Sequence, residues 1–161
     1  MEKQAAEMIE IIKRQEELLQ FDSFNEDIAL KLGLACIEEA KEMKVPVSVE
    51  ITMNGSMLFY YRSEGTSEHN KDWLRRKTNA VNKLDMSSLQ LYYYLIYAKR
   101  QLKEDMFLDP MDYAACGGGF PIRIKGIGLV GSICYSALPH IEDHEFVVKV
   151  LSKFLNVSIN N

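Results

Sequence analysis

His140 and His144 lie four residues apart in the segment PHIEDHE, so they share one face of any helix that forms there. Two imidazoles on one helix face can hold a metal ion or a heme iron. The spacing is not that of the HExxH zinc motif, because Ile141 follows the first histidine, and the chain has no CxxCH heme-attachment motif. His144 also continues an apolar stripe, which is typical of a core histidine with a satisfied hydrogen bond. A metal site, a small-ligand contact and a structural role therefore all stay open for this pair.

A glycine triplet, Gly117–Gly119, stands directly before Phe120. Its backbone N–H groups could bind an anion, because glycines allow the chain to turn several amides toward one point. The spacing matches neither the dinucleotide-binding glycine motif nor the phosphate-binding P-loop. The alternative is a tight turn between two edge strands. Gly118, Gly119 and Phe120 are thus candidate ligand contacts that have a structural alternative.

A lysine interrupts the apolar stripe of the segment that contains Trp73 and Arg76. Burying Lys77 there would cost several kcal/mol unless its charge is paired. A carboxylate such as Asp143 or Glu145, or a bound anion, would supply the partner. The alternative is that Lys77 lays its stem on Trp73 and keeps its ammonium in water.

These groups together suggest a pocket between the Trp73–Lys77 helix, the glycine turn and the start of the last helix. An anionic or carboxylate-bearing ligand fits best, because positive side chains and a helix N-terminus would surround it. The candidate ligand-binding residues are Trp73, Arg76, Lys77, Gly118, Gly119, Phe120, Arg123, His140, Asp143 and His144. No nucleophile–base pair or carboxylate dyad follows from the spacing, so catalytic residues are not assigned and enzymatic activity stays undecided.

The elements that position these residues follow from hydrophobic periodicity and turn signals. Helices are expected over about 2–19, 23–45, 67–84, 88–103 and 139–155, and strands over about 47–53, 56–62, 113–116, 120–124 and 127–136. Two capping boxes are expected at helix starts, formed by Ser23 with Glu26 and by Ser87 with Gln90. A hairpin turn is expected at Asn54-Gly55. The strand over 47–53 alternates and is expected to be half-buried. The 88–103 helix is apolar nearly all round, with Tyr92–Tyr94 and Tyr97, and is expected to be buried on several sides, within the domain or between subunits.

This order of elements predicts an α+β fold with an antiparallel sheet of about five strands and helices on its faces. At 161 residues the chain is expected to form a single domain, 1–161, with an N-terminal helix at about 2–20 packed on a core at about 23–155.

Composition excludes several function classes. A net charge of -4 gives no bulk attraction to nucleic acid or to anionic membranes, and no apolar run approaches the ~20 residues of a membrane span. Three cysteines are an odd number without paired spacing, which predicts reduced thiols and a cytoplasmic location.

Three motifs resemble the GlcG/HbpS-like family, also called the heme-degrading domain family. They are GGGFPI from Gly117, a following strand with Val130-Gly131-Ser132, and PHIEDHE at a helix start. Trp73, Arg76 and Lys77 on one helix, and Ser87 and Ser88 opening the next, resemble the small single-domain branch of that family. The resemblance spans roughly residues 47–155. It implies a profilin-like α-β-α sandwich, a homo-oligomer and, in some members, a link to heme, for which His140 or His144 would be the axial ligand.

Two functional hypotheses follow. The first is a homo-oligomer that binds a small ligand, either heme or a small anion, in the pocket described above. The second is a structural or protein-interaction scaffold, in which the histidines, the lysine and the glycines only hold the fold together. Loss of a bound ligand in Lys77→Ala or His144→Ala, rather than loss of stability alone, would separate the two.

Overall fold

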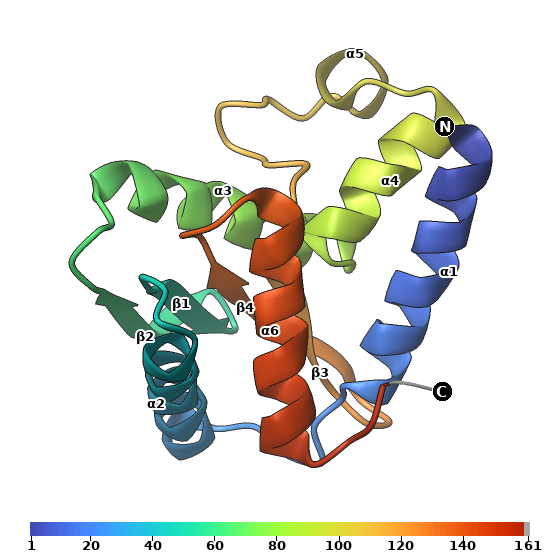
Figure 1. Cartoon of the computed structure of the whole chain (residues 1–161). Helices are drawn as coiled ribbons and strands as arrows, with labels where there is room; N and C mark the ends of the chain where they lie inside the picture. Colours follow the sequence, from blue (N-terminus) through green and yellow to red (C-terminus); the bar gives the residue numbers. More distant parts are fainter. Residues whose placement is uncertain (160–161) are drawn as a thin grey trace.

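The computed structural model describes residues 1–159, which form six helices and one four-stranded sheet (Figure 1). The helices are α1 (Glu2–Leu18), α2 (Glu26–Met43), α3 (Glu68–Leu84), α4 (Ser88–Ala98), α5 (Leu102–Met106) and α6 (His140–Leu155). The strands are β1 (Ser48–Met53), β2 (Ser56–Arg62), β3 (Gly119–Ile124) and β4 (Gly128–Tyr135). All neighbouring strands are antiparallel and follow the order β2-β1-β4-β3.

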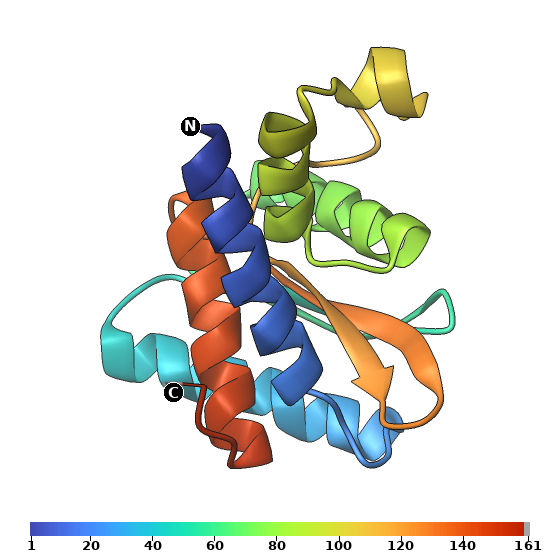
Figure 2. The same ribbon diagram turned by 90° about the vertical axis from the view of Figure 1, so that its right-hand side faces the viewer.

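The sheet is covered on both faces, so the predicted α+β sandwich with helices on each side of an antiparallel sheet is confirmed. Helices α2 and α6 lie on one face and α3 on the other, and Figure 2 shows the sheet between the red α6 and the green α3. Val49, Ile51 and Ile133 point to the α2–α6 side and are fully buried. On the same side the rings of Tyr135 and Phe146 stack with centroids 3.9 Å apart. This apolar layer is the main core.

The opposite face of the sheet packs against α3 through polar side chains. Thr52 and Ser132 share a hydrogen bond of 2.9 Å between neighbouring strands. The Thr78 hydroxyl of α3 donates to Glu50 at 3.2 Å and contacts the Cys134 sulfur at 3.3 Å. Strand β1 is therefore buried on both faces, and the prediction that it is half-buried was wrong. The alternation of apolar and polar residues in β1 was predicted correctly, but its polar face packs against the polar face of α3 instead of facing water.

The sheet has four strands within residues 1–159, not five, because residues 113–116 form no strand. The Ala114 N–H donates to the Arg76 carbonyl at 3.1 Å, so this segment is bound to α3 instead of to the sheet edge. The hairpin at Asn54-Gly55 is confirmed, with φ values of 49° and 81° that suit a tight turn.

Two helix starts differ from the expected capping boxes. Asn25, not Ser23, caps α2, since its side chain accepts the Ile28 N–H at 2.9 Å. Ser87 caps α4 by accepting the Gln90 N–H at 3.2 Å, as expected. Its own N–H, however, donates to Glu16 of α1 at 2.6 Å, so the second half of the box comes from another helix.

The aromatic helix predicted over 88–103 is divided. Lys99 ends α4 in a left-handed conformation, with φ 53°, and α5 begins at Leu102. Helix α4 packs mainly against α1 and also contacts α3, α6 and β3, and its residues are buried or half-buried except Tyr97, which is 54% exposed, so the helix is covered on several sides but not completely within this chain. Across residues 1–159, none of the helices combines the length and the apolar composition that a bilayer span requires.

Candidate functional site

A cavity of about 390 Å³ lies between α3, the glycine turn and the start of α6. We call it the α3–α6 cavity, and its volume is within the range of small-molecule sites. Its lining residues are His69, Asn70, Trp73, Lys77, Cys116, Ser136, Ala137, Leu138, His140 and Asp143. Four of the candidate ligand-binding residues, Trp73, Lys77, His140 and Asp143, are therefore brought together at the place that the sequence indicated.

A buried ion pair forms one wall of the cavity. The Lys77 side chain is 2% exposed, and its Nζ donates to Asp143 Oδ2 at 3.0 Å and to the Tyr135 carbonyl at 2.9 Å. Asp143 Oδ1 accepts the N–H groups of Ala137 and Leu138 at 3.1 and 2.8 Å. Burial raises the pKa of Asp143, and the Lys77 ammonium opposes part of that rise. The expected carboxylate partner of Lys77 is thus present, and both charges are satisfied inside the protein.

The glycine turn is shaped by this ion pair. Gly118 has φ +122°, and a Cβ there would lie 2.3 Å from the Tyr135 carbonyl oxygen and 2.6 Å from Lys77 Nζ. The N–H of Gly119 donates to the Ser88 hydroxyl at 2.8 Å, and Phe120 is fully buried in the core. The turn is therefore a close backbone approach that admits Lys77. The amide of Gly119 is used within the fold rather than presented to an anion.

His140 stands at the first position of α6 and faces the cavity. Its Nδ1 accepts the Gly117 N–H at 3.1 Å, so the neutral ring carries its proton on Nε2. The ring of Tyr92, from α4, meets it edge-on with centroids 4.8 Å apart. Burial, and secondly the Lys77 charge, lower the pKa of His140, so the ring is neutral at pH 7.

Sequence reasoning missed His69 as a member of the site. Trp73 Nε1–H donates to His69 Nε2 at 3.1 Å, which places the proton of the neutral His69 ring on Nδ1. The spacing of four residues on one helix was the available signal. The Asn70 amide, which bridges to the Ser136 carbonyl at 3.0 Å, was also missed.

Two of the candidate cations do not line the cavity. The Arg76 guanidinium stacks over Trp73 at 4.1 Å and donates twice to the Pro110 carbonyl, at 2.6 and 3.0 Å. Arg123 pairs with Asp85 at 3.0 Å and with Glu16 at 3.3 Å, joining β3 to the end of α3 and to α1. Both arginines were expected to attract a ligand, but Arg76 fastens the Pro110 loop to α3, and Arg123 fastens two helices to the sheet.

His144 is a core residue rather than part of the cavity. It is 3% exposed, its ring packs against Phe120 at 5.8 Å, and its Nε2 bonds to Gln15 Oε1 at 2.8 Å. Because Oε1 only accepts, the proton lies on Nε2, and Nδ1 is buried without a partner among the described residues. Burial lowers the pKa of His144 to about 4.

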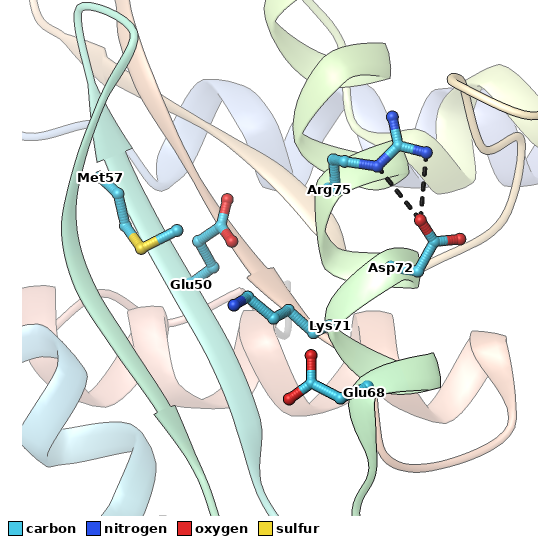
Figure 3. A pocket seen from close by; sticks show the side chains of 6 residues that line it. All are labelled: Glu50, Met57, Glu68, Lys71, Asp72 and Arg75. Atoms are coloured by element: carbon cyan, nitrogen blue, oxygen red, sulfur yellow. Dashed lines mark hydrogen bonds and ion pairs between the residues drawn. The ribbon is translucent and has the colours of Figure 1, made fainter.

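A second cavity, of about 360 Å³, lies between α3 and the β1–β2 hairpin. Figure 3 shows its side chains: Glu50, Met57, Glu68, Lys71, Asp72 and Arg75. Arg75 pairs with Asp72 at 3.1 Å and with Asp112 at 2.9 Å, and Lys71 lies over the Tyr60 ring at 5.2 Å. Charges of both signs compensate one another here, so this cavity is a weaker candidate for ligand selection.

Comparisons with known proteins assign the chain to a family. A family model described as "Haem degrading protein HbpS-like" matches residues 24–152. The chain belongs to the HbpS-like family. A UPF0303 protein of Pseudomonas entomophila is 37% identical over 150 residues, covering 93% of this chain and 83% of the relative. A UPF0303 protein of Serratia proteamaculans is 36% identical over 151 residues, covering 94% of each chain.

Solved structures support the fold of this HbpS-like protein. The Ybr137w protein superposes with a TM-score of 0.85 at 25% identity, covering 92% of this chain and 87% of that one. HbpS superposes with a TM-score of 0.66 at 23% identity, covering 84% and 92%. A PduOC:heme complex does so with a TM-score of 0.69 at 18% identity, covering 86% and 99%. At these last two identities the likeness concerns the fold alone.

His140 and His144 of this HbpS-like protein do not fit the ligation of a heme iron. His140 has its Nδ1 lone pair occupied by the Gly117 N–H and a proton on Nε2. The open nitrogen of His144 is buried in the core. Within residues 1–159, no cluster of three or more histidine, cysteine or carboxylate side chains is arranged to hold a metal ion. The family name therefore does not carry a heme-iron site over to these residues.

Proposed function

We propose that this HbpS-like protein binds a small, acceptor-rich ligand, such as a carboxylate with an apolar body, in the α3–α6 cavity. The observation that carries the proposal is that the Asp143 carboxylate and the Asn70 amide oxygen on the wall already accept hydrogen bonds from within the chain, whereas Lys77 and His140 keep N–H groups that have no partner among the described residues. Asp143 accepts three hydrogen bonds from within the chain, and the Asn70 amide oxygen accepts the Ser67 N–H at 2.9 Å. The Lys77 ammonium has three N–H groups, of which two are used, and His140 keeps its Nε2–H.

The start of α6 supports the same choice of ligand. Pro139 precedes the helix and supplies no side-chain cap, so no N-cap side chain occupies the first-turn amides, although Glu142 and Asp143 in the first turn compensate part of the positive dipole end. Trp73, Ala137 and Leu138 give the cavity apolar surface for the rest of the ligand. Because Lys77 and Asp143 neutralise each other and His140 is uncharged, selection rests on hydrogen-bond direction more than on net charge.

We further propose that the protein is a homo-oligomer in the cytoplasm. The aromatic surface of α4 and α5 supports an association between copies, since Tyr97 is 54% and Phe107 87% exposed. All three cysteines, which lie within the described residues, are free thiols, in agreement with a reducing compartment. The same aromatic surface also favours the second candidate function, an interaction scaffold without a small ligand.

The test uses protein purified from cells, examined by native mass spectrometry, with benzoate as a compact carboxylate probe in a thermal-shift titration. Ala137→Phe fills the α3–α6 cavity, and Ala35→Phe is the matched control in a groove between α2 and α6. A co-purified mass or a saturable benzoate shift that is lost in Ala137→Phe and kept in Ala35→Phe supports ligand binding. Absence of both signals from the wild type, or their survival in Ala137→Phe, overturns the proposal, and the scaffold function then remains.

A further inference from the structure

We infer that His140 determines the specificity of the α3–α6 cavity as a fixed hydrogen-bond donor, so that the cavity takes ligand oxygen atoms and rejects metal-centred ligands at this residue. The inference rests on the proposed function, because it names the group that selects the ligand. A donor at His140 would distinguish this chain from the heme binding to which the name of its family refers.

The direction of the hydrogen bond fixes the tautomer. A main-chain N–H can only donate, so the Gly117 amide at 3.1 Å requires a lone pair on His140 Nδ1. The neutral ring then has its proton on Nε2, which is the nitrogen without a hydrogen-bond partner among residues 1–159. His140 therefore presents a donor and not a lone pair.

Backbone packing holds the amide and the ring in this arrangement. A Cβ on Gly117 would lie 2.2 Å from the carbonyl oxygen of His140, so the two main chains are in direct contact. The next residue, Gly118, is wedged against Tyr135 and Lys77 at φ +122°. The amide cannot rotate away from Nδ1 unless the glycine turn and the start of α6 separate.

Binding a metal through Nε2 would reverse the ring's role. The proton would move to Nδ1, where it would face the Gly117 N–H, and two donors would oppose each other. In metal sites the second nitrogen of a ligating histidine normally donates to an acceptor, which is the opposite arrangement. The lost hydrogen bond and the unpaired amide together cost about 1–3 kcal/mol, about 5- to 150-fold in metal affinity.

Burial and the Lys77 ammonium on α3 lower the pKa of His140, whereas the Asp143 carboxylate on α6 raises it, and the Tyr92 ring on α4 meets the imidazole edge-on. Asp143 is committed to Lys77 and to two backbone amides, so it is not available to balance a second cation. Protonation on Nδ1 would meet the same opposing Gly117 amide. The ring is therefore held neutral and donating.

The first experiment is ¹⁵N NMR of the imidazoles at pH 7, with signals assigned by single histidine substitutions. The chain has three histidines, and the hydrogen bonds place the proton on Nε2 in His140 and His144 and on Nδ1 in His69. His140 should carry its proton on Nε2 and His69 on Nδ1, so His69 is an internal control of opposite tautomer. A proton on Nδ1 of His140, or a mixture of tautomers, would overturn the inference.

The second experiment compares two replacements of His140 by benzoate titration. In His140→Gln the longer amide places an N–H near the former Nε2, whereas His140→Asn keeps an acceptor for Gly117 but has no group at that position. Affinity should stay within a few-fold in the glutamine variant and fall about 10-fold in the asparagine variant, the size of one hydrogen bond to a charged acceptor. Equal loss in both variants, or no loss in either, contradicts a donor role.

Hemin separates this inference from the proposed function. A hemin titration followed by absorbance should give the same spectra for wild type and His140→Ala, because His140 offers no nitrogen to iron. A saturable Soret shift in the wild type that disappears in His140→Ala contradicts the inference. A wild type that fails to bind benzoate counts against the proposed function, and the NMR and hemin results still decide the state of His140.

Discussion

Removing one partner of the buried Lys77–Asp143 pair should destabilise the fold far more than neutralising both partners together. Lys77→Met keeps most of the apolar stem and removes the ammonium. Asp143 then stays 2% exposed and keeps the Ala137 and Leu138 amides, but it has no countercharge. Removing one partner of a buried ion pair typically costs about 3–5 kcal/mol. That is a large part of the free energy of unfolding of an ordinary domain, which is about 5–15 kcal/mol.

Neutralising both charges should recover most of this loss. In Lys77→Met/Asp143→Asn the asparagine oxygen can still accept the two amides, and no unpaired charge remains. Replacement of a buried pair by uncharged groups is often neutral or stabilising. The double variant should therefore lie within about 1–2 kcal/mol of the wild type, with a coupling energy of about 2 kcal/mol or more.

Urea unfolding at pH 7, followed by circular dichroism, measures these free energies. The matched control is Lys31→Met, because Lys31 pairs with Asp27 at 2.9 Å while both side chains are about two-thirds exposed, at 66% and 67%. This surface pair should contribute less than about 0.5 kcal/mol. The reasoning is refuted if Lys77→Met is as mild as Lys31→Met, or if the double variant is no more stable than Lys77→Met.

Histidine burial, carboxylate burial and glycine geometry each give a further measurable effect. The pKa of His144 is lowered from 6.5 to about 4, so its contribution is complete above pH 6.5 and is lost as the pH falls toward 4. This loss amounts to up to about 3 kcal/mol, and His144→Gln should flatten the pH dependence of urea stability. Burial raises the pKa of Glu50, so stability falls as the pH rises through its range. Glu50→Gln, which keeps an acceptor for Thr78, should gain about 1–2 kcal/mol at pH 7 by thermal unfolding, and a loss would contradict this. Gly118→Ala should cost several kcal/mol, whereas Gly55→Ala, at φ +81° with nothing within 4 Å, should cost only about 1–2 kcal/mol. Equal costs for the two glycines would refute the steric account.

The sequence indicated that Lys77 needs a partner but could not choose between Asp143 and Glu145. The choice depends on the rotational phase of α6, since Asp143 is buried while Glu145 is exposed. Stripes on single helices predict which face is inward. They do not say which residue of a distant helix, 66 positions along the chain, meets that face.

The role of His140 could not be predicted because its partner is a main-chain group. Gly117 was noticed as part of a turn, yet nothing in a sequence shows toward which ring an amide points. The partner of His144 was equally hidden, since Gln15 lies 129 positions earlier on α1. The apolar stripe that favoured a core role for His144 was the correct signal.

The prediction of a fifth strand was wrong for a related reason. Tyr113 to Cys116 has the composition of an edge strand, but its backbone hydrogen-bonds to the Arg76 carbonyl of α3 instead of to a sheet edge. Local pattern predicts that a segment needs hydrogen bonds, and tertiary packing decides which element supplies them. Residues 113–116 therefore run beside α3 into the glycine turn, and this places Cys116 on the wall of the cavity.

Fold and ligand choice are therefore set by different groups in this cavity. Lys77, Asp143 and the glycine turn hold α3, β4 and α6 together, so removing one charge of the pair or adding a Cβ to the turn should destabilise the fold whatever the cavity binds. His140 makes one hydrogen bond to the turn and directs its other nitrogen into the cavity, so its replacement should change binding at little cost in stability. At this position the tautomer of His140 decides between an oxygen acceptor and a metal, and the Gly117 N–H favours the tautomer with a donor on Nε2. We therefore expect the ligand of this chain to follow that hydrogen bond rather than the heme in its family's name.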